Sequence, residues 1–263
     1  IVFKKGKPTT INVAEPKISS NSVLIKVRSS CISAGTELVT MSGTKDNLFK
    51  RALKKPKNII RAINYLKQKG ILNTYDLLKD KSSVIAPSGY SASGVVIEKG
   101  SEVQNIKVGD RVAAAGGTAI HAEYIVVSKN LVSKLPRNLD FSLSSSVAIG
   151  SIALHAVRRC NPSLGEYVAV FGVGLIGQIV AKLLTISGAI VISIDKNKDN
   201  IKLSKKMGSD FIFDSDDEKM IPTIIDITKG RGVDKVIFSA NAEKPSVLSK
   251  AFKIIRKKGC LVM

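Results

Sequence analysis

The chain has 263 residues, of which 44% are hydrophobic and 24% charged. These fractions exclude a disordered or fibrous protein, and the length suffices for two domains. No apolar run approaches the roughly 20 residues of a membrane span and no signal peptide opens the sequence, so we expect a cytoplasmic protein without a membrane partner. Cys31, Cys160 and Cys260 are too few and too scattered for a disulfide framework or a CxxC metal site.

The formal net charge of +20 raises the question of a nucleic-acid partner. Residues 44–81 hold eleven Lys or Arg against three Asp, a local excess of +8. Within this segment Ile59, Ile63 and Leu66 recur at helical spacing, which predicts a basic helical insertion with one buried and one solvated face. Because no zinc finger, aromatic platform or RGG tract is present, we expect no nucleic-acid function. A solvated surface and a patch that attracts a phosphorylated small molecule remain the alternatives.

Residues 1–138 are predicted to form a compact β domain. The runs SVLIKVRSS, SASGVVIEKG and AEYIVVS are rich in β-branched residues and are bounded by glycine, proline or charged turns. The following run FSLSSSVAIGSIALHAVRR is expected to form a helical connection.

Residues 139–263 are predicted to form an α/β domain. The short apolar runs YVAVF, AIVISID, FIFD and DKVIFSA are separated by segments of helical length and period. That alternation indicates βαβ units and a parallel sheet. The chain begins with Ile1 and stops in KKGCLVM, which is typical of the start of a buried strand, so we expect it to be incomplete at both ends.

A glycine motif carries the strongest chemical signal. In YVAVFGVGLIGQ a strand runs directly into Gly172, Gly174 and Gly177 at G-x-G-x-x-G spacing. We expect these residues, with Leu175 and Ile176 at the start of the following helix, to receive the pyrophosphate of a dinucleotide on free N–H groups. The alternative is that the glycines serve only a tight strand-to-helix turn.

The second predicted strand of this domain ends in Asp195, where an acid can accept the ribose hydroxyls of NAD and repel the 2′-phosphate of NADP. Lys196 and Lys198 weaken that argument, since either could reach a phosphate. We expect NAD rather than NADP, with further cofactor contacts from Ser239 and Ala240. The alternative role for Asp195 is to cap the next helix.

The motifs GTEL, GYSASGVVIEKGSEVQNIKVGDRV, AEYIVV and FGVGLIGQ occur in this order along almost the whole chain. In this order they resemble the medium-chain dehydrogenase/reductase superfamily, the alcohol dehydrogenase-like enzymes. The resemblance implies an α/β protein in which a GroES-like β-barrel catalytic domain precedes a doubly wound Rossmann domain. It also implies a nicotinamide cofactor and a small-molecule substrate in a cleft between the domains.

The family's zinc-dependent members carry Cys-Gly-Thr-Asp and Gly-His-Glu motifs, whose Cys and His bind the metal. Here the corresponding positions read AGTE at 34–37 and GYS at 89–91, so alanine and tyrosine replace both ligands. No cysteine-rich lobe for a structural zinc follows GDRV either. A catalytic zinc needs at least three good ligands, so we predict that the protein binds no metal.

The resemblance places Tyr90 at the metal-ligand position, where a phenol could donate a hydrogen bond to a carbonyl oxygen as hydride arrives. The alternatives are that Tyr90 fills the volume of the absent zinc or marks a turn. Thr36 matches the family's proton-relaying hydroxyl, and Glu37 matches an acid that orients its neighbours. His121 is a candidate acid or base. His155, within an apolar helical run, is predicted to be a packed helix residue.

A narrower resemblance links SCISAGTE, the basic insertion and LGEYVAVFGVGLIGQ to two-part oxidoreductases of polysaccharide synthesis. It implies a sugar or nucleotide-sugar substrate and, in the full-length protein, a C-terminal glucose-fructose-oxidoreductase-like domain; we also expect a homo-oligomer. The alternatives are an NADPH-dependent quinone or enone reductase and a non-catalytic cofactor-binding half of a larger protein.

Overall fold

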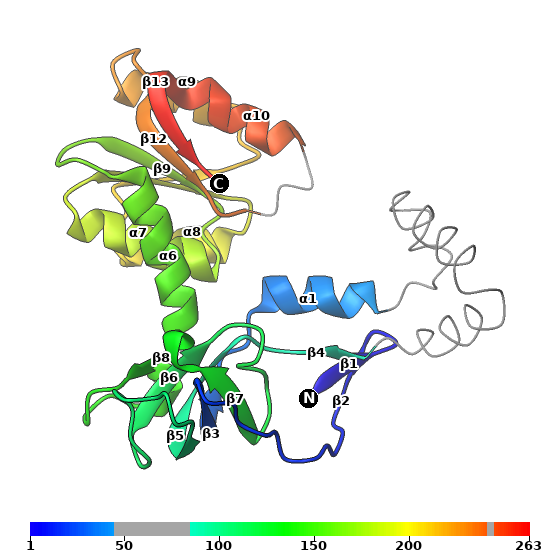
Figure 1. Ribbon diagram of the computed structural model, residues 1–263. Helices are drawn as coiled ribbons and strands as arrows, with labels where there is room; N and C mark the ends of the chain where they lie inside the picture. The colour runs from blue at the N-terminus through cyan, green and yellow to red at the C-terminus, as the bar shows by residue number, and fades with distance from the viewer. Residues whose placement is uncertain (45–84, 241–244) are drawn as a thin grey trace, which may run out of the picture. The chain divides into compact units, whose positions relative to one another are not determined.

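The computed structural model describes residues 1–44, 85–240 and 245–263, which divide into two compact units, Ile1–Ala148 and Ile149–Met263 (Figure 1). Apart from Thr44, the basic insertion expected at about 44–81 lies outside these residues. None of the helices in the described ranges is long and apolar enough to cross a membrane.

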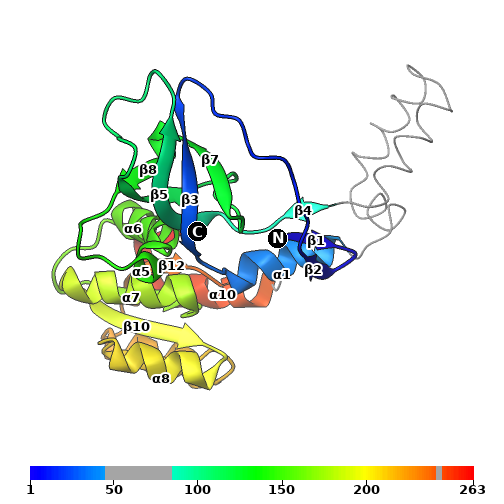
Figure 2. The ribbon, with the colours of Figure 1, turned by 90° about the horizontal axis from the view of Figure 1, so that it is seen from below.

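The first unit is built from antiparallel strands. One sheet has the order β7-β3-β5-β6-β8, and its strands β7, β3, β5 and β8 can be followed in Figure 2. Another sheet has the order β2-β1-β4. The core of the larger sheet is made of valine, isoleucine and alanine side chains from its strands. The elements of this unit are β1 (Val2–Lys4), β2 (Lys7–Thr9), β3 (Ser22–Ser30), α1 (Ala34–Gly43), β4 (Ala86–Pro87), β5 (Ser91–Lys99), β6 (Arg111–Ala115), β7 (Tyr124–Ser128), η2 (Lys129–Leu131), β8 (Val132–Lys134) and α5 (Phe141–Ser144).

The segment 139–148 stays with the first unit, although the sequence analysis assigned it to the second domain. The hydroxyl of Ser93 donates to the carbonyl of Phe141 at 2.5 Å, and the hydroxyl of Ser91 donates to the carbonyl of Ser145. These bonds fix α5 and the turn that follows it to β5, because both serine side chains are buried and need acceptors.

The second unit is a parallel five-stranded sheet of order β11-β10-β9-β12-β13. Numbered along the chain, this order is 3-2-1-4-5, which is that of the Rossmann fold. The elements are α6 (Val147–Cys160), which begins at the end of the first unit, β9 (Tyr167–Phe171), α7 (Leu175–Ile186), β10 (Ile190–Asp195), α8 (Lys198–Lys206), β11 (Phe211–Asp214), α9 (Met220–Ile227), β12 (Val233–Phe238), α10 (Pro245–Ile254) and β13 (Ile255–Val262).

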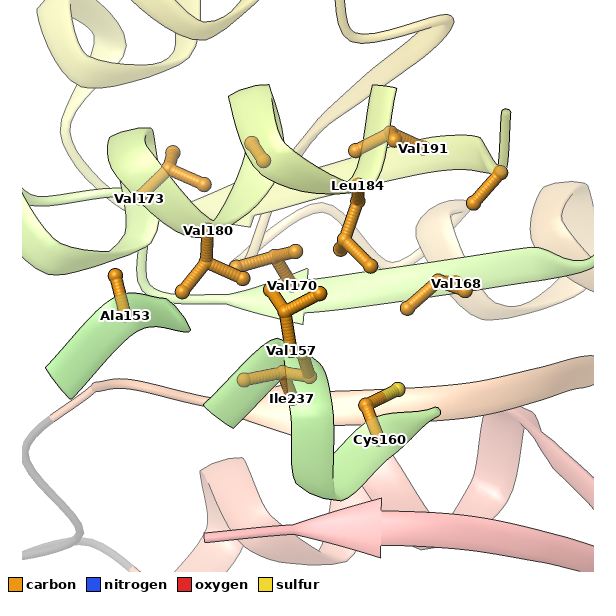
Figure 3. Packing of buried hydrophobic residues seen from close by; sticks show 12 residues of the cluster. Ala153, Val157, Cys160, Val168, Val170, Val173, Val180, Leu184, Val191 and Ile237 are labelled. Carbon is orange, nitrogen blue, oxygen red and sulfur yellow. The ribbon is translucent and has the colours of Figure 1, made fainter. Parts of the chain in front are cut away.

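Strand β9 contributes to the cores on both faces of this sheet. Val168 and Val170 pack against α6 and α7 (Figure 3). Ala169 and Phe171 face α9 and α10. Side chains alternate between the two faces of a strand, and helices cover both faces of this sheet. Residues 168–171 of β9 are therefore all buried, which explains why its sequence is an unbroken apolar run.

The predicted fold class is confirmed: antiparallel strands come first, and a parallel Rossmann-like sheet follows. The prediction for His155 was wrong, since its side chain is exposed. The buried face of α6 carries Ala153, Val157 and Cys160, which recur at helical spacing, and His155 falls off this face.

Candidate active site and cofactor site

Two of the three motif glycines are required by close contacts within the chain. Gly172 has φ +86°, and an added Cβ would come 2.6 Å from the backbone N of Ala240. An added Cβ at Gly177 would lie 2.0 Å from the carbonyl oxygen of Gly172, because α7 crosses the turn at that point. Any larger residue at either position would therefore force the backbone apart.

Gly174 differs from its neighbours because an added Cβ would meet no atom within 4 Å. It is the N-cap of α7 and supplies no side chain to the helix end. Within the described residues, the N–H groups of Leu175, Ile176 and Gly177 have no acceptor. Because Gly174 has no side chain, the N-terminus of α7 stays accessible. Its free N–H groups and the positive end of the helix dipole can therefore bind an anionic group.

Ser239 and Ala240 hold this turn from the end of β12. The Ser239 hydroxyl donates to the carbonyl of Gly172 at 2.5 Å, and its backbone N–H donates to the carbonyl of Phe171 at 2.8 Å. Ala240 lies against Gly172. Both residues thus support the glycine turn, and their predicted contact with a cofactor stays a prediction.

Asp195 ties the end of β10 to the glycine turn. Its Oδ2 accepts from the backbone N of Val173 at 2.8 Å and from Nδ2 of Asn200 at 3.3 Å, and its Oδ1 accepts from the backbone N of Asn197 at 2.9 Å. Asn197, not Asp195, is the N-cap of α8. The carboxylate is half-buried and lies beside the glycine turn, while Lys196 is exposed.

In the first unit, the structure brings two predicted catalytic residues into direct contact. Nε2 of His121 lies 3.0 Å from Oε1 of Glu37, and Nδ1 of His121 lies 2.8 Å from the hydroxyl of Ser30. Ser30 ends β3, Glu37 comes from the first turns of α1, and His121 precedes β7. The exposed fractions of the His121 and Glu37 side chains are 8% and 13%, so the pair is largely shielded from water.

Thr36 lies next to this cluster but is exposed on α1. Its Oγ1 is 3.3 Å from the hydroxyl of Ser33, and the backbone N of Ser33 donates to Oε1 of Glu37 at 3.1 Å. The side chain of Glu37 thus returns to the residue before its own helix, much as in a capping box. This bond holds the carboxylate toward His121.

Tyr90 follows a glycine that packs on the His121 ring. The backbone N of His121 donates to the carbonyl of Ser88 at 2.8 Å, and the carbonyl of Tyr90 accepts from Gly116 N at 2.9 Å. The Tyr90 side chain is half-buried, and no partner for its hydroxyl occurs in the described part of the chain. The phenol is therefore available to an external acceptor.

The prediction that the chain binds no zinc stays a prediction. Across 1–44, 85–240 and 245–263, no three His, Cys, Asp or Glu side chains gather as a metal site would require. Burial, together with the nearby Glu37 carboxylate, raises the pKa of the Cys31 thiol.

Ser30 and Asn200 were missed by the sequence analysis. Ser30 stands 91 positions from His121 in the chain, so no spacing rule connects them. Asn200 could have been suspected, because it lies one helical turn after the cap of α8 and faces back toward the strand end.

A glycine turn leading into a free helix N-terminus, on a sheet of order 3-2-1-4-5, defines a dinucleotide-binding type of fold. Comparisons with known proteins agree with this type of fold.

Residues 175–263 match a family described as zinc-binding dehydrogenase. The chain is 30% identical over 190 residues to (R,R)-butanediol dehydrogenase of Bacillus subtilis strain 168, a match that covers 63% of this chain and 54% of that protein. The chain therefore spans about half the length of this curated relative.

Solved structures show the same fold. Quinone oxidoreductase from Coxiella burnetii superposes with a TM-score of 0.73 at 21% identity, covering 99% of this chain and 73% of that one. A mycobacterial protein in complex with NADPH gives a TM-score of 0.72 at 20% identity, with 95% and 67% of the two chains covered. The chain is thus similar to zinc-binding dehydrogenases in its second unit and shares the fold of these solved oxidoreductases.

Proposed function

We propose that the protein is an NAD(P)-dependent oxidoreductase that transfers hydride between a nicotinamide cofactor and an alcohol or carbonyl substrate, without zinc. The observation that carries the proposal is the open N-terminus of α7 at Gly174, with the Asp195 carboxylate beside the same turn. The butanediol dehydrogenase relative supports an alcohol or carbonyl as the substrate class. A sugar or nucleotide sugar is the narrower substrate that we propose.

The residues at the glycine turn fit a dinucleotide. The free N–H groups of Leu175, Ile176 and Gly177 would hold the pyrophosphate. A carboxylate offers about four lone-pair positions, and three of those on Asp195 are filled. One position on Oδ1 is left for a ribose hydroxyl, and a second hydroxyl would have to displace Asn200. The charge of Asp195 would repel a 2′-phosphate, which favours NAD.

When bound, the nicotinamide supplies the hydride chemistry. The chain must supply a proton donor for the substrate oxygen and must orient the substrate. In the first unit, the available groups are the Tyr90 hydroxyl, which has no partner in the described residues, and the cluster of His121 with Glu37. We assign Tyr90 the hydrogen bond to the reacting oxygen and Glu37 the orientation of its neighbours. Thr36 is a second hydroxyl within reach of the cluster.

The test is titration of the purified chain with NADH and with NADPH, followed by nicotinamide fluorescence, with metal content measured on the same sample. We expect NADH to bind at least about 10-fold more tightly than NADPH, and Asp195→Asn to remove most of that difference. Asp199→Asn, an exposed acid on α8, is the matched control and should change neither affinity. Stoichiometric zinc, or binding of neither cofactor, would overturn the proposal.

An NADPH-dependent quinone or enone reductase is the second candidate. The exposed Lys196 and Lys198 next to Asp195 favour it, since either could pair with a 2′-phosphate. The fold neighbours that are a quinone oxidoreductase and an NADPH complex are consistent with it. A clear NADPH preference in the same titration would select this candidate. A non-catalytic cofactor-binding half would bind a cofactor but turn over no substrate.

A further inference from the structure

Both ring nitrogens of His121 are engaged by the protein. Nε2 contacts Glu37 Oε1 at 3.0 Å and Nδ1 contacts Ser30 Oγ at 2.8 Å, while the residue is only 8% exposed. His121 therefore has no nitrogen with which to touch a substrate directly. Any proton that it exchanges with a substrate must pass through one of its two partners.

The chemistry of the partners sets the direction of these hydrogen bonds. A carboxylate can only accept hydrogen bonds, so Nε2 must be the donor to Glu37. In the neutral ring the other nitrogen, Nδ1, then carries no proton and accepts from the hydroxyl of Ser30. Glu37 thus fixes the tautomer of His121, and Nδ1 of His121 accepts the hydrogen bond from the Ser30 hydroxyl. The same order of acid, histidine and serine occurs in acyl-transfer enzymes.

The surroundings hold this geometry in place. Glu37 Oε1 is also fixed by the backbone N of Ser33 at 3.1 Å. The ring of His121 lies against Gly89, and its backbone N donates to the carbonyl of Ser88 at 2.8 Å. A ring held on both sides and at its backbone does not need to reorganise when its charge changes, which is what a proton relay requires.

Ser30 is the member of this chain from which a proton can leave the cluster. It is more exposed than His121 and is the last residue of β3. It pairs with Ala92 of β5, and the backbone N of the next residue, Cys31, donates to the carbonyl of Ser91 at 2.9 Å. Tyr90 directly precedes Ser91, so the end of the relay and the free phenol lie at the same end of the β3–β5 pair.

We propose that Ser30, His121 and Glu37 form a proton relay in which the Ser30 hydroxyl exchanges the proton with the substrate oxygen. His121 stores that proton, and Glu37 is a positioning residue. This inference rests on the proposed oxidoreductase function and assigns its proton path. It makes Ser30, and not the His121 ring itself, the group that exchanges the proton with the substrate, while Tyr90 keeps its hydrogen bond to the same oxygen.

The relay balances the reaction. With a bound nicotinamide, which would take the hydride from the alcohol C–H bond, the alcohol proton would pass to Ser30 Oγ. Ser30 gives its own proton to Nδ1 of His121, and the resulting imidazolium lies beside the Glu37 carboxylate. The products would be a carbonyl compound, reduced nicotinamide and one proton, which leaves His121 for solvent through one of its two partners. Reduction follows the same path in reverse.

The first experiment reads the tautomer and needs no substrate. The chain has 2 histidines, so ¹⁵N-histidine labelling gives two ring systems, and His155→Gln identifies the His121 signals. We expect neutral His121 to carry its proton on Nε2, and Glu37→Gln to give a mixture of both tautomers. A proton on Nδ1 in the wild-type chain would overturn the relay, because Ser30 would then be an acceptor at the resting state.

The second experiment measures turnover with NAD⁺ and butane-2,3-diol, and in reverse with NADH and butane-2,3-dione. Ser30→Ala should lower kcat by roughly 100-fold or more while the Kd for NADH stays unchanged, since proton-transfer groups contribute that much. Ser30→Thr keeps a hydroxyl that can transfer the proton, so its kcat should stay within about 10-fold of the wild-type value. Ser29→Ala, the neighbour on β3, is the matched control and should match wild type.

The outcomes separate the relay from the function on which it rests. Cofactor binding with full kcat in Ser30→Ala would overturn the relay and leave the oxidoreductase intact. Failure of the wild type to bind either cofactor would overturn the function itself. If the wild-type chain binds a cofactor but turns over neither the diol nor the dione, this result would count against proton exchange between Ser30 and an alcohol or carbonyl oxygen.

Discussion

The ring of His121 packs directly on Gly89. A Cβ added at Gly89 would come 2.8 Å from His121 Nδ1 and 2.9 Å from its backbone N, and Gly89 has φ +88°. We predict that Gly89→Ala displaces His121 from its partners and lowers both stability and kcat. Gly109→Ala is the matched control, because Gly109 has φ +90° but nothing within 4 Å.

Both substitutions should cost about 1 kcal/mol from backbone strain, and Gly89→Ala should cost roughly 1–3 kcal/mol more from the clash. Urea unfolding of the two variants measures the difference directly. Equal destabilisation of the two variants would show that His121 does not depend on contact with this glycine.

The glycine turn gives a prediction that separates binding from folding. Gly174→Ala adds a methyl group in open space, at φ −69°, so the melting temperature of the cofactor-free chain should stay unchanged. The same methyl group would meet a bound pyrophosphate, so affinity for NADH should fall by about 10-fold, equivalent to about 1.4 kcal/mol. Thermal melting with and without NADH checks both parts.

Gly177→Ala should behave in the opposite way. Its Cβ would lie 2.0 Å from the carbonyl oxygen of Gly172, so the cofactor-free chain itself should be destabilised, by about 1–3 kcal/mol. A Gly174→Ala variant that unfolds as readily as Gly177→Ala would contradict the assignment of open space at Gly174.

The fold could be predicted where the signal is local. The run from Tyr167 to Ile186 contains a strand, a glycine turn and a helix in direct succession, and each part follows from neighbouring residues. Asp195 could be found for the same reason, since it ends the next strand. The alternative that it caps α8 was wrong because the residue two positions later, Asn197, takes that position.

The candidate active site was only partly predictable, because tertiary contacts assemble it. Glu37 and His121 were found as separate candidates, but their contact joins residues 84 positions apart. Ser30 gave no signal, since a serine at the end of a strand is common and its role depends on the ring that reaches it. Glu37 and His121 were therefore predictable as separate groups, but the order in which a proton would pass between them was not.

Three buried serines in the second unit provide a prediction about packing. The hydroxyls of Ser193, Ser204 and Ser209 lie 2.6–2.8 Å from one another, and all three residues are at most 3% exposed. In a ring, each hydroxyl can donate once and accept once, so the group is satisfied without water. Removal of one member leaves a buried donor or acceptor without a partner, so Ser204→Ala should cost about 1–3 kcal/mol.

Removal of all three hydroxyls should cost less than the sum of the three single changes, because no orphaned polar group remains. Urea unfolding of the single and triple alanine variants tests this. Ser187→Ala, an exposed serine at the end of α7, is the control. Strict additivity of the three changes would indicate three independent hydrogen bonds and not a ring.

Asp234 gives the sheet a dependence on pH. Its carboxylate accepts from Nε of Arg256 at 2.7 Å and from the backbone N of Tyr167 at 2.9 Å, which links the starts of β9, β12 and β13. Burial alone would raise the pKa of Asp234, but the hydrogen bonds from Arg256 and Tyr167 outweigh it and hold the pKa below the ordinary value of 3.8.

Because the folded pKa lies below the unfolded one, the folded state favours the ionised carboxylate. The contribution of Asp234 is therefore complete well above pH 4 and is lost as the pH falls below about 4 and through the lowered folded pKa. We predict that Asp234→Asn destabilises the chain by about 1 kcal/mol at pH 7, a modest figure because the ion pair is partly solvated.

The difference between Asp234→Asn and wild type should shrink as the pH falls from 5 to 2.5, since protonated aspartate and asparagine are then equally neutral. Urea unfolding across that range measures it. Asp216→Asn is the matched control: Asp216 is 81% exposed and 4.0 Å from Lys250, so its removal should leave the curve unchanged. A difference at Asp234 that stays constant with pH would mean that packing, and not the charge, links the three strands.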